Sequence, residues 1–177
     1  MEKKNNILFY VIFCFFYTIL IRIIINYDFV INYIFLTPIT FLVSMIANLD
    51  FTFINGTGFV NYDLNIIVDK SCAGINFFLL TLIFSFVILV NSKIKILRFF
   101  YIVLFSTVSA YFVAILSNLV RIILSIKVKI IRFEINWFSQ THWFHYALGI
   151  VVFLSFLIGY YLILERYKKW IIKTNKN

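Results

Sequence analysis

The residues best suited to chemistry are a cysteine, an arginine and two histidines that interrupt or border long apolar runs. Cys72 follows Asp69-Lys70-Ser71 and is expected to open a helix, with Ser71 as its N-cap. A thiol in the first turn of a helix lies at the positive end of the helix dipole, which favours the nucleophilic thiolate. Gly74 then leaves room for the backbone of a substrate. Cys72 is therefore the candidate nucleophile, whereas Cys14, in the middle of an apolar run, is interpreted as a small apolar residue.

Arg121 interrupts another apolar run, and placing a guanidinium inside a membrane costs at least about 2.5–3.5 kcal/mol. Asn118 precedes it by three residues, and Ser117 and Ser125 lie one helical turn to either side. This polar stripe is expected to face protein or substrate rather than lipid. The alternative is that Arg121 extends to the membrane surface as an anchor, which is how Arg22 is interpreted.

His142 and His145 are the only histidines, and Gly149 follows His145 by one helical turn. A pair at this spacing could bind a metal. Only Cys72 offers an obvious third ligand, and no carboxylate lies nearby in sequence, so no metal and no other cofactor are expected. The plainer alternative places both histidines in an interfacial belt with Trp137 and Trp143. An imidazole near a thiol and a guanidinium is suited to moving a proton near pH 7.

The composition assigns these residues to a membrane protein. Of the 177 residues, 63% are apolar and 13% are charged, against about 45–50% and about 25% in soluble domains. These values exclude a disordered chain, a coiled coil and an ordinary soluble domain, and two cysteines exclude a disulfide framework. The net charge is +9, but the basic residues lie mainly between or beyond apolar runs, which indicates membrane-facing loops and not nucleic-acid binding.

Five apolar runs are long enough, or nearly so, to cross the hydrocarbon core, which takes about 20 helical residues. They are Ile7 to Ile25, Val30 to Leu49, Ile75 to Val90, Ile96 to Ile126 and Tyr146 to Leu164. We therefore expect an all-α polytopic membrane protein with about five transmembrane helices, in a range of roughly four to six. Pro38 is expected to kink or break the second helix or to make it re-entrant. The fourth run is longer than a single crossing requires, so one of its ends should protrude or bend.

The segment 50–71 differs from the rest of the chain. Asn55-Gly56 is a strong hairpin-turn signal, and Leu64, Ile66 and Val68 alternate with polar residues as in a short strand. Such backbone cannot face lipid, so this segment is expected to lie outside the membrane, on the extracytoplasmic side, or to be covered by protein. The whole chain, 1–177, is otherwise interpreted as a single membrane-embedded domain with a basic cytoplasmic tail at 165–177.

Three consecutive crossings bring Cys72, Arg121 and His145 to the same membrane face, whatever the orientation. The basic loop near Lys93 and the basic tail lie on the other side, which the positive-inside rule makes cytoplasmic. The three residues are then extracytoplasmic. Together they suit acyl transfer, in which the thiolate attacks a carbonyl, the imidazole moves the proton and the guanidinium stabilises the oxyanion.

Three short motifs, in this order, resemble those of the exosortase/archaeosortase family. They are Ser71-Cys72-Ala73-Gly74-Ile75, Asn118-Leu119-Val120-Arg121-Ile122 and His145-Tyr146-Ala147-Leu148-Gly149. The resemblance runs from Gly56 to Gly149 and is greatest to the exosortase K subgroup. It implies that Cys72 is the nucleophile and that Arg121 and His145 complete the catalytic set. The chain is shorter than most members, and His142 lies close enough to His145 that either could be the acting histidine.

By this resemblance the chain is a membrane cysteine peptidase or transpeptidase of the cytoplasmic membrane, a hydrolase acting on peptide bonds. Its substrates would be exported proteins with a C-terminal sorting tail made of a short motif, a membrane helix and a basic cluster. The acyl group would pass to a lipid or glycan acceptor in the cell envelope. Asn118, Gly74 and His142 are candidates for substrate binding.

A small transporter or channel subunit without catalytic activity is the main alternative. It predicts polar residues along a path through the bilayer, whereas here they gather at one depth. A membrane thiol oxidoreductase would need a cysteine pair, and Cys14 and Cys72 lie at different depths.

Overall fold

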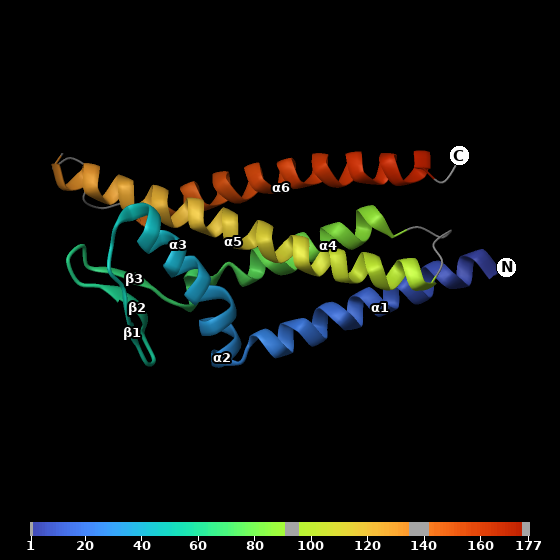
Figure 1. Cartoon of the computed structure of the whole chain (residues 1–177), viewed down its shortest axis with the longest axis horizontal. Helices are drawn as coiled ribbons and strands as arrows, with labels where there is room; N and C mark the ends of the chain where they lie inside the picture. Colours follow the sequence, from blue (N-terminus) through green and yellow to red (C-terminus); the bar gives the residue numbers. More distant parts are fainter. Residues whose placement is uncertain (1, 91–95, 135–141, 175–177) are drawn as a thin grey trace. The chain divides into compact units, whose positions relative to one another are not determined.

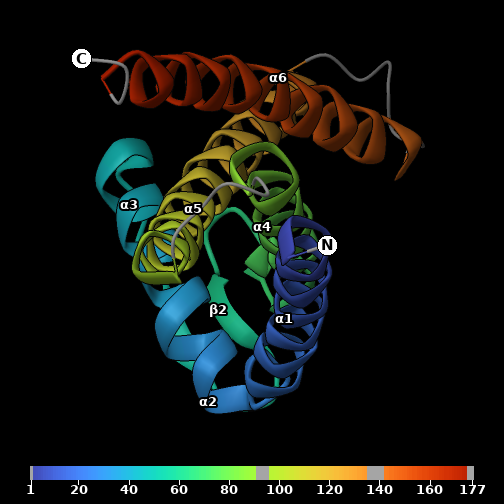
Figure 2. The same cartoon turned by 90° about the vertical axis from the view of Figure 1, so that its right-hand side faces the viewer.

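The computed structural model describes the backbone of residues 2–90, 96–134 and 142–174, and the side chains of residues 8–90, 98–129 and 147–169. These residues are mostly helical (Figures 1 and 2), and five stretches are long and apolar enough to cross a membrane. The stretches are Leu8–Ile25, Asp28–Ala47, Lys70–Leu89, Arg98–Lys129 and Ala147–Lys169. Each corresponds to one of the predicted runs, so the chain has helices of the length and composition typical of a multi-pass membrane protein.

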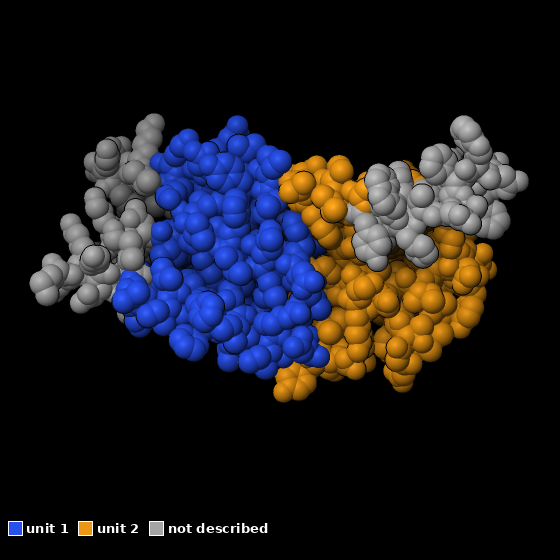
Figure 3. Space-filling view, turned by 180° about the vertical axis from the view of Figure 1, so that it is seen from behind, with its two compact units in different colours: residues 1–26, 75–114, 157–177 blue, residues 27–74, 115–156 orange. Residues whose placement is uncertain are grey.

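The chain divides into two compact units, coloured separately in Figure 3. Unit 1 contains residues 1–26, 75–114 and 157–177, and unit 2 contains residues 27–74 and 115–156. The two longest helices, α5 (Ile96–Glu134) and α6 (His142–Thr174), each contribute one part to each unit. Helix α5 has 39 residues, or about 58 Å at 1.5 Å per residue. It therefore exceeds the hydrocarbon core of about 30 Å, as expected from the sequence.

Unit 1 is a helical bundle in which α1 (Glu2–Ile25) packs along α4 (Ile75–Leu89), as both views of the cartoon show. Its buried apolar core includes Leu89, Ile102 and Leu164, from α4, α5 and α6 respectively. Long apolar helices associate in lipid mainly through close packing and buried polar contacts. Close packing is seen where the Tyr10 ring on α1 stacks on Phe99 of α5, with ring centroids 4.4 Å apart.

Hydroxyl groups connect the helices of unit 1 inside its apolar core. The Tyr160 hydroxyl on α6 is 2.7 Å from the Ser85 hydroxyl on α4 and 2.7 Å from the Ser109 hydroxyl on α5. Each bond removes the desolvation cost that an unpaired hydroxyl would have in apolar surroundings. Arg22, interpreted from the sequence as a surface anchor, also has a protein partner, since its Nη1 donates to Asn76 Oδ1 at 3.1 Å.

In unit 2 the second candidate span remains helical around its proline. It consists of α2 (Asp28–Val30), the π-helix η1 (Ile31–Leu36) and α3 (Thr37–Ala47). Pro38 lacks an N–H, and its ring would clash with the carbonyl four residues earlier in a regular α-helix. The turn just before Pro38 is wider than an α-helical turn, because the Thr37 N–H bonds to the carbonyl of Asn32, five residues earlier. The same carbonyl also accepts the Thr37 hydroxyl at 2.8 Å. The expected kink or break therefore takes the form of a π-helical segment.

A small sheet follows α3, at the segment where the sequence predicted extended backbone. Strands β1 (Thr52–Ile54), β2 (Gly58–Asn61) and β3 (Ile66–Val68) are antiparallel in the order β1-β2-β3. The predicted Asn55-Gly56 turn joins β1 to β2, and Gly56 has a left-handed φ of 83°. The predicted hairpin is thus confirmed, with β3 added where apolar and polar residues alternate.

Gly58 fixes how closely β2 and β3 can approach. Its φ is 110°, and a Cβ built on it would lie 2.6 Å from the Val68 carbonyl oxygen. Backbone conformation and space therefore both require glycine at this position. Val68, at the end of β3, is 1% exposed, so β3 is held firmly where it leads toward Cys72.

Candidate functional site

Cys72 lies in a separate short turn rather than in the first turn of α4. The 3₁₀ helix η2 (Lys70–Ala73) carries it, Gly74 follows with a left-handed φ of 69°, and α4 begins only at Ile75. The expectation that Cys72 opens the membrane helix is therefore wrong. Gly74 is the reason, because its left-handed backbone ends one helix before the next begins.

The N-cap of this turn is Asp69, and the expectation that Ser71 caps it is also wrong. The Asp69 carboxylate accepts the Ser71 backbone N–H at 2.9 Å and the Ser71 hydroxyl at 2.5 Å. The Cys72 N–H in turn donates to the Asp69 carbonyl at 2.9 Å. Ser71 Oγ also lies 3.9 Å from the Cys72 sulfur. The half-buried thiol is thus held by a turn in which the Ser71 N–H and hydroxyl and the Cys72 N–H all bond to Asp69.

Asn118 joins the Cys72 turn to α5. Its side chain is fully buried, and its amide nitrogen donates to the Cys72 backbone carbonyl. Gly74 packs against the same amide, since a Cβ on Gly74 would lie 3.2 Å from Asn118 Nδ2. Three residues singled out by the sequence, Cys72, Gly74 and Asn118, therefore meet at one point in unit 2.

Arg121, one turn after Asn118, packs against α6. Its Cδ lies 3.4 Å from where a Cβ on Gly149 would be, and its Cζ lies 5.4 Å from the centroid of the Phe153 ring, a cation–π contact. The Arg121 Nε is buried, and no described residue accepts a hydrogen bond from it. Ser125, one turn further on, donates its hydroxyl to the Arg121 carbonyl at 2.8 Å. Arg121 is half-buried and contacts α6 inside unit 2.

For the two histidines the structure describes the backbone only. Helix α6 begins at His142, and position 145 lies in the same helix, one turn before Gly149. The side chains of His142 and His145 lie outside the described residues. Among the residues whose side chains are described, no group of three potential metal-ligating side chains occurs.

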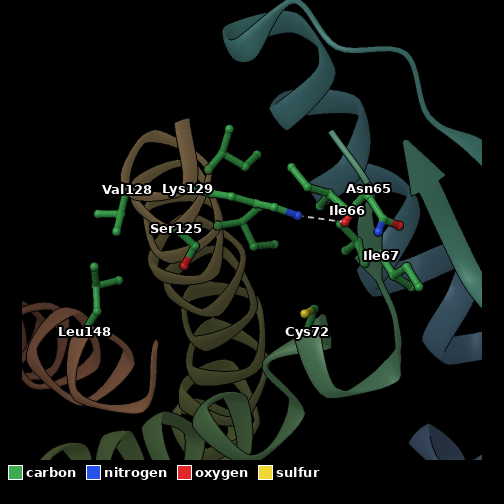
Figure 4. Close-up of a pocket in the computed structure, with 11 residues that line it drawn as sticks. Asn65, Ile66, Ile67, Cys72, Ser125, Val128, Lys129 and Leu148 are labelled. Carbon is green, nitrogen blue, oxygen red and sulfur yellow. Dashed lines mark hydrogen bonds between the residues drawn. The ribbon is translucent and has the colours of Figure 1, made fainter. Parts of the chain in front are cut away.

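Cys72 opens into a cavity of about 350 Å³. Figure 4 shows its sulfur pointing into the space between β3 and α5. The lining residues are Asn65, Ile66, Ile67, Val68, Cys72, Ile122, Ser125, Ile126, Val128, Lys129 and Leu148. Most are apolar, and Lys129 is the one charged residue in this set; its Nζ donates to the Asn65 carbonyl at 2.8 Å. Arg121 and Asn118 do not line this cavity; Asn118 bonds to the Cys72 carbonyl and Arg121 contacts α6.

Lys129, Phe153 and Asp69 were not assigned to the site from the sequence. For Lys129 a signal existed, because positions 118, 122, 125 and 129 follow the helical period and share one face of α5. Phe153 follows Gly149 by one turn in the same way. The role of Asp69 depends on the exact start of η2, which local pattern does not define.

The described residues thus provide a thiol that lines a mostly apolar cavity, with the half-buried Arg121 in the same unit. A thiol so placed can act as a nucleophile toward a carbonyl that enters the cavity. The chain matches no protein-family model, no curated protein and no solved structure.

Proposed function

We propose that the chain is a membrane cysteine peptidase or transpeptidase that cleaves C-terminal sorting tails of exported proteins. Cys72 is the nucleophile, and Arg121 stabilises the oxyanion or holds the thiolate. His145, or His142 in its place, moves the proton. Asn118 and Gly74 position the Cys72 turn. The proposal places the enzyme in the cytoplasmic membrane with the site on the extracytoplasmic face.

The observation that carries this proposal is the hydrogen bond from Asn118 to the Cys72 carbonyl. This bond attaches the turn that carries the Cys72 thiol, which lines a cavity, to helix α5. Asn118 lies one helical turn before Arg121 on α5, so the bond connects the first two of the three motifs on which the family resemblance rests. A guanidinium inside a membrane helix is costly unless it has a role, and here it is half-buried against Gly149 and Phe153.

The reaction proceeds in two steps. The Cys72 thiolate attacks the scissile carbonyl, forming a C–S bond and an oxyanion that the Arg121 guanidinium stabilises. The C–N bond then breaks, and the departing amine, which carries the membrane helix and basic cluster, takes a proton from the histidine. In the second step an acceptor nucleophile, which is water or a group on a lipid or glycan of the cell envelope, attacks the thioester. The histidine takes the proton of this nucleophile, and the C–S bond breaks to restore the thiolate.

The decisive experiment uses candidate substrates from the same genome. Proteins that end in a short motif, an apolar helix and a basic cluster are expressed with the chain, and loss of the tail is measured by mass spectrometry. The wild-type chain should remove the tail and a Cys72→Ala variant should not. Blocking the second step should leave an acyl group on Cys72 that neutral hydroxylamine releases.

Cys14→Ala is the matched control, because Cys14 lies within the first span and belongs to unit 1, whereas the residues of the site belong to unit 2. It should process the same proteins at the wild-type rate. Normal processing by Cys72→Ala would refute the proposal, and so would a requirement for Cys14.

A further inference from the structure

The cavity beside Cys72 runs along the edge of a strand. Asn65, Ile66, Ile67 and Val68 all line it, and they are consecutive (Figure 4). Successive side chains in a strand point to opposite faces of the sheet, so a cavity over one face would be lined by alternate residues only. Asn65 precedes β3, and all three residues of the strand, Ile66 to Val68, line the cavity, which places it against the backbone edge of β3.

This edge of β3 has no strand beside it among the described residues. The sheet order is β1-β2-β3, and β3 pairs on one side only, with Phe59 opposite Val68 and Asn61 opposite Ile66. In an antiparallel pair, alternate residues direct their N–H and C=O groups away from the partner. An unpaired edge of this kind is a template for another extended chain.

The two ends of the edge are chemically distinct. At one end the Lys129 ammonium bonds to the Asn65 carbonyl, which occupies the backbone acceptor there. At the other end Val68 leads through Asp69 into η2 and Cys72. Val68 directs its carbonyl toward β2, where it would lie 2.6 Å from a Cβ on Gly58. By alternation, Ile67 is the residue of β3 whose N–H and C=O face the open edge, between a lysine and the thiol.

We infer that the substrate binds as an extended peptide that pairs with the free edge of β3, with its scissile carbonyl delivered to Cys72. This mode, strand addition, combines main-chain hydrogen bonds with contacts to alternate side chains. The apolar lining from Ile122, Ile126 and Leu148 suits apolar side chains on that peptide. A lipid chain would fill the apolar space but would leave the edge N–H and C=O groups unpaired, which is costly.

The direction of the peptide follows from the topology, and this step rests on the proposed function. Strand β3 precedes the span Lys70–Leu89, so it lies on the loop side of Cys72. The part of the substrate after the scissile bond is its membrane helix. The segment before the scissile bond therefore lies along β3 and runs parallel to it, toward Cys72.

The test uses a peptide electrophile and does not require the natural substrate. The purified full chain carries Cys14→Ala, so that Cys72 is its only thiol, and is treated with acetyl-tetravaline chloromethyl ketone. The thiolate displaces chloride and forms a thioether, which mass spectrometry quantifies over time. We expect alkylation at least about tenfold faster than with the single-valine ketone, since only the longer peptide extends far enough to bond to both the N–H and the C=O of Ile67.

N-methylation of the probe separates edge pairing from simple apolar binding. In a paired strand every second N–H points to the neighbour, so methylation at alternate valines should slow alkylation about threefold to tenfold each. Methylation at the valines between them should have little effect. An equal effect at all positions, or no effect at any, overturns the inference, as does equal alkylation by the two ketones.

A second measurement reads out the position of the bound peptide. Benzoylphenylalanine is placed at Ile67 on β3 or, as a matched control, at Phe53 on β1, the opposite edge; these positions are 50% and 42% exposed. After alkylation of Cys72, irradiation should cross-link the peptide at position 67 and not at position 53. Cross-linking at position 53, or at neither position, overturns the inference.

The outcomes distinguish this inference from the proposed function. Alkylation of Cys72 by the ketones needs no turnover, so edge pairing can be demonstrated even if no tailed protein is processed. Conversely, processing that depends on Cys72 without the alternating effect of methylation would retain the proposed function and remove the β3 edge from it.

Discussion

The side-chain amide of Asn118 donates a hydrogen bond to the backbone carbonyl of Cys72, a residue 46 positions earlier in the chain. This bond ties a short 3₁₀ turn to the middle of a long helix. Because Asn118 is fully buried, the bond is shielded from water and determines where the turn can lie.

Replacing Asn118 with alanine should loosen the Cys72 turn. The Cys72 carbonyl would lose its partner, and a hydrogen bond of this kind contributes about 0.5–1.5 kcal/mol. We expect a lower free energy of unfolding in detergent, by about that amount, and slower processing of tailed proteins. Leu116→Ala, on the exposed side of the same helix, is the control and should change neither. Wild-type processing by Asn118→Ala would show that the bond does not position the thiol.

Gly74→Ala should also disturb the turn, for a different reason. A left-handed residue with a Cβ costs about 1–2 kcal/mol, and this Cβ would lie 3.2 Å from Asn118 Nδ2. Gly159→Ala is the matched control, because a Cβ there would meet nothing within 4 Å, and alanine favours a helix by up to about 1 kcal/mol over glycine. Thermal unfolding should therefore rank Gly159→Ala at or above wild type and Gly74→Ala below it. The reverse order would contradict the described backbone.

Arg121→Lys should abolish most of the activity while the protein still folds. Lysine keeps the positive charge but loses the planar group and its Nε donor. Loss of one oxyanion donor typically lowers a rate about 10²-fold or more. The control is Arg22→Lys, which alters an arginine bonded to Asn76 in unit 1 and should process tailed proteins normally. Equal processing by both variants would argue that Arg121 has a packing role only.

The two thiols should differ in accessibility to a charged, membrane-impermeant alkylating reagent. Cys72 precedes α4 in a turn that opens into a cavity, whereas Cys14 lies within the span Leu8–Ile25. In sealed vesicles we expect Cys72 to be labelled from the extracytoplasmic side and Cys14 from neither side, as measured by peptide mapping. Labelling of Cys72 from the cytoplasmic side alone would reverse the proposed orientation.

The sequence was sufficient to predict the spans and the hairpin, because both depend on local rules. A run of about 20 apolar residues predicts a crossing wherever it occurs, and Asn55-Gly56 predicts a turn from its own backbone preferences. Helix ends were less predictable. Both Asp69 and Ser71 are good capping residues, and only the three-dimensional course of η2 decides that Asp69 accepts the N–H bond.

The contacts around the candidate site depend on tertiary structure, so no local pattern could give them. Spacing placed Asn118 and Arg121 on one helix, but it could not reveal that Asn118 meets the Cys72 carbonyl or that Arg121 meets Phe153. The π-helix before Pro38 was likewise not predictable in form, because a proline can be accommodated by a kink, a break or a wider turn. The course of the chain around Asn32 selects the last of these.

Gly58 has an evolutionary consequence. Any side chain there would collide with the Val68 carbonyl, and the backbone itself is left-handed. Homologues that keep this sheet should therefore retain glycine at this position, while the sequences of their apolar helices vary. This glycine lies just upstream of the Cys72 turn. It would allow the sequences of distant homologues to be aligned where the membrane segments alone could not.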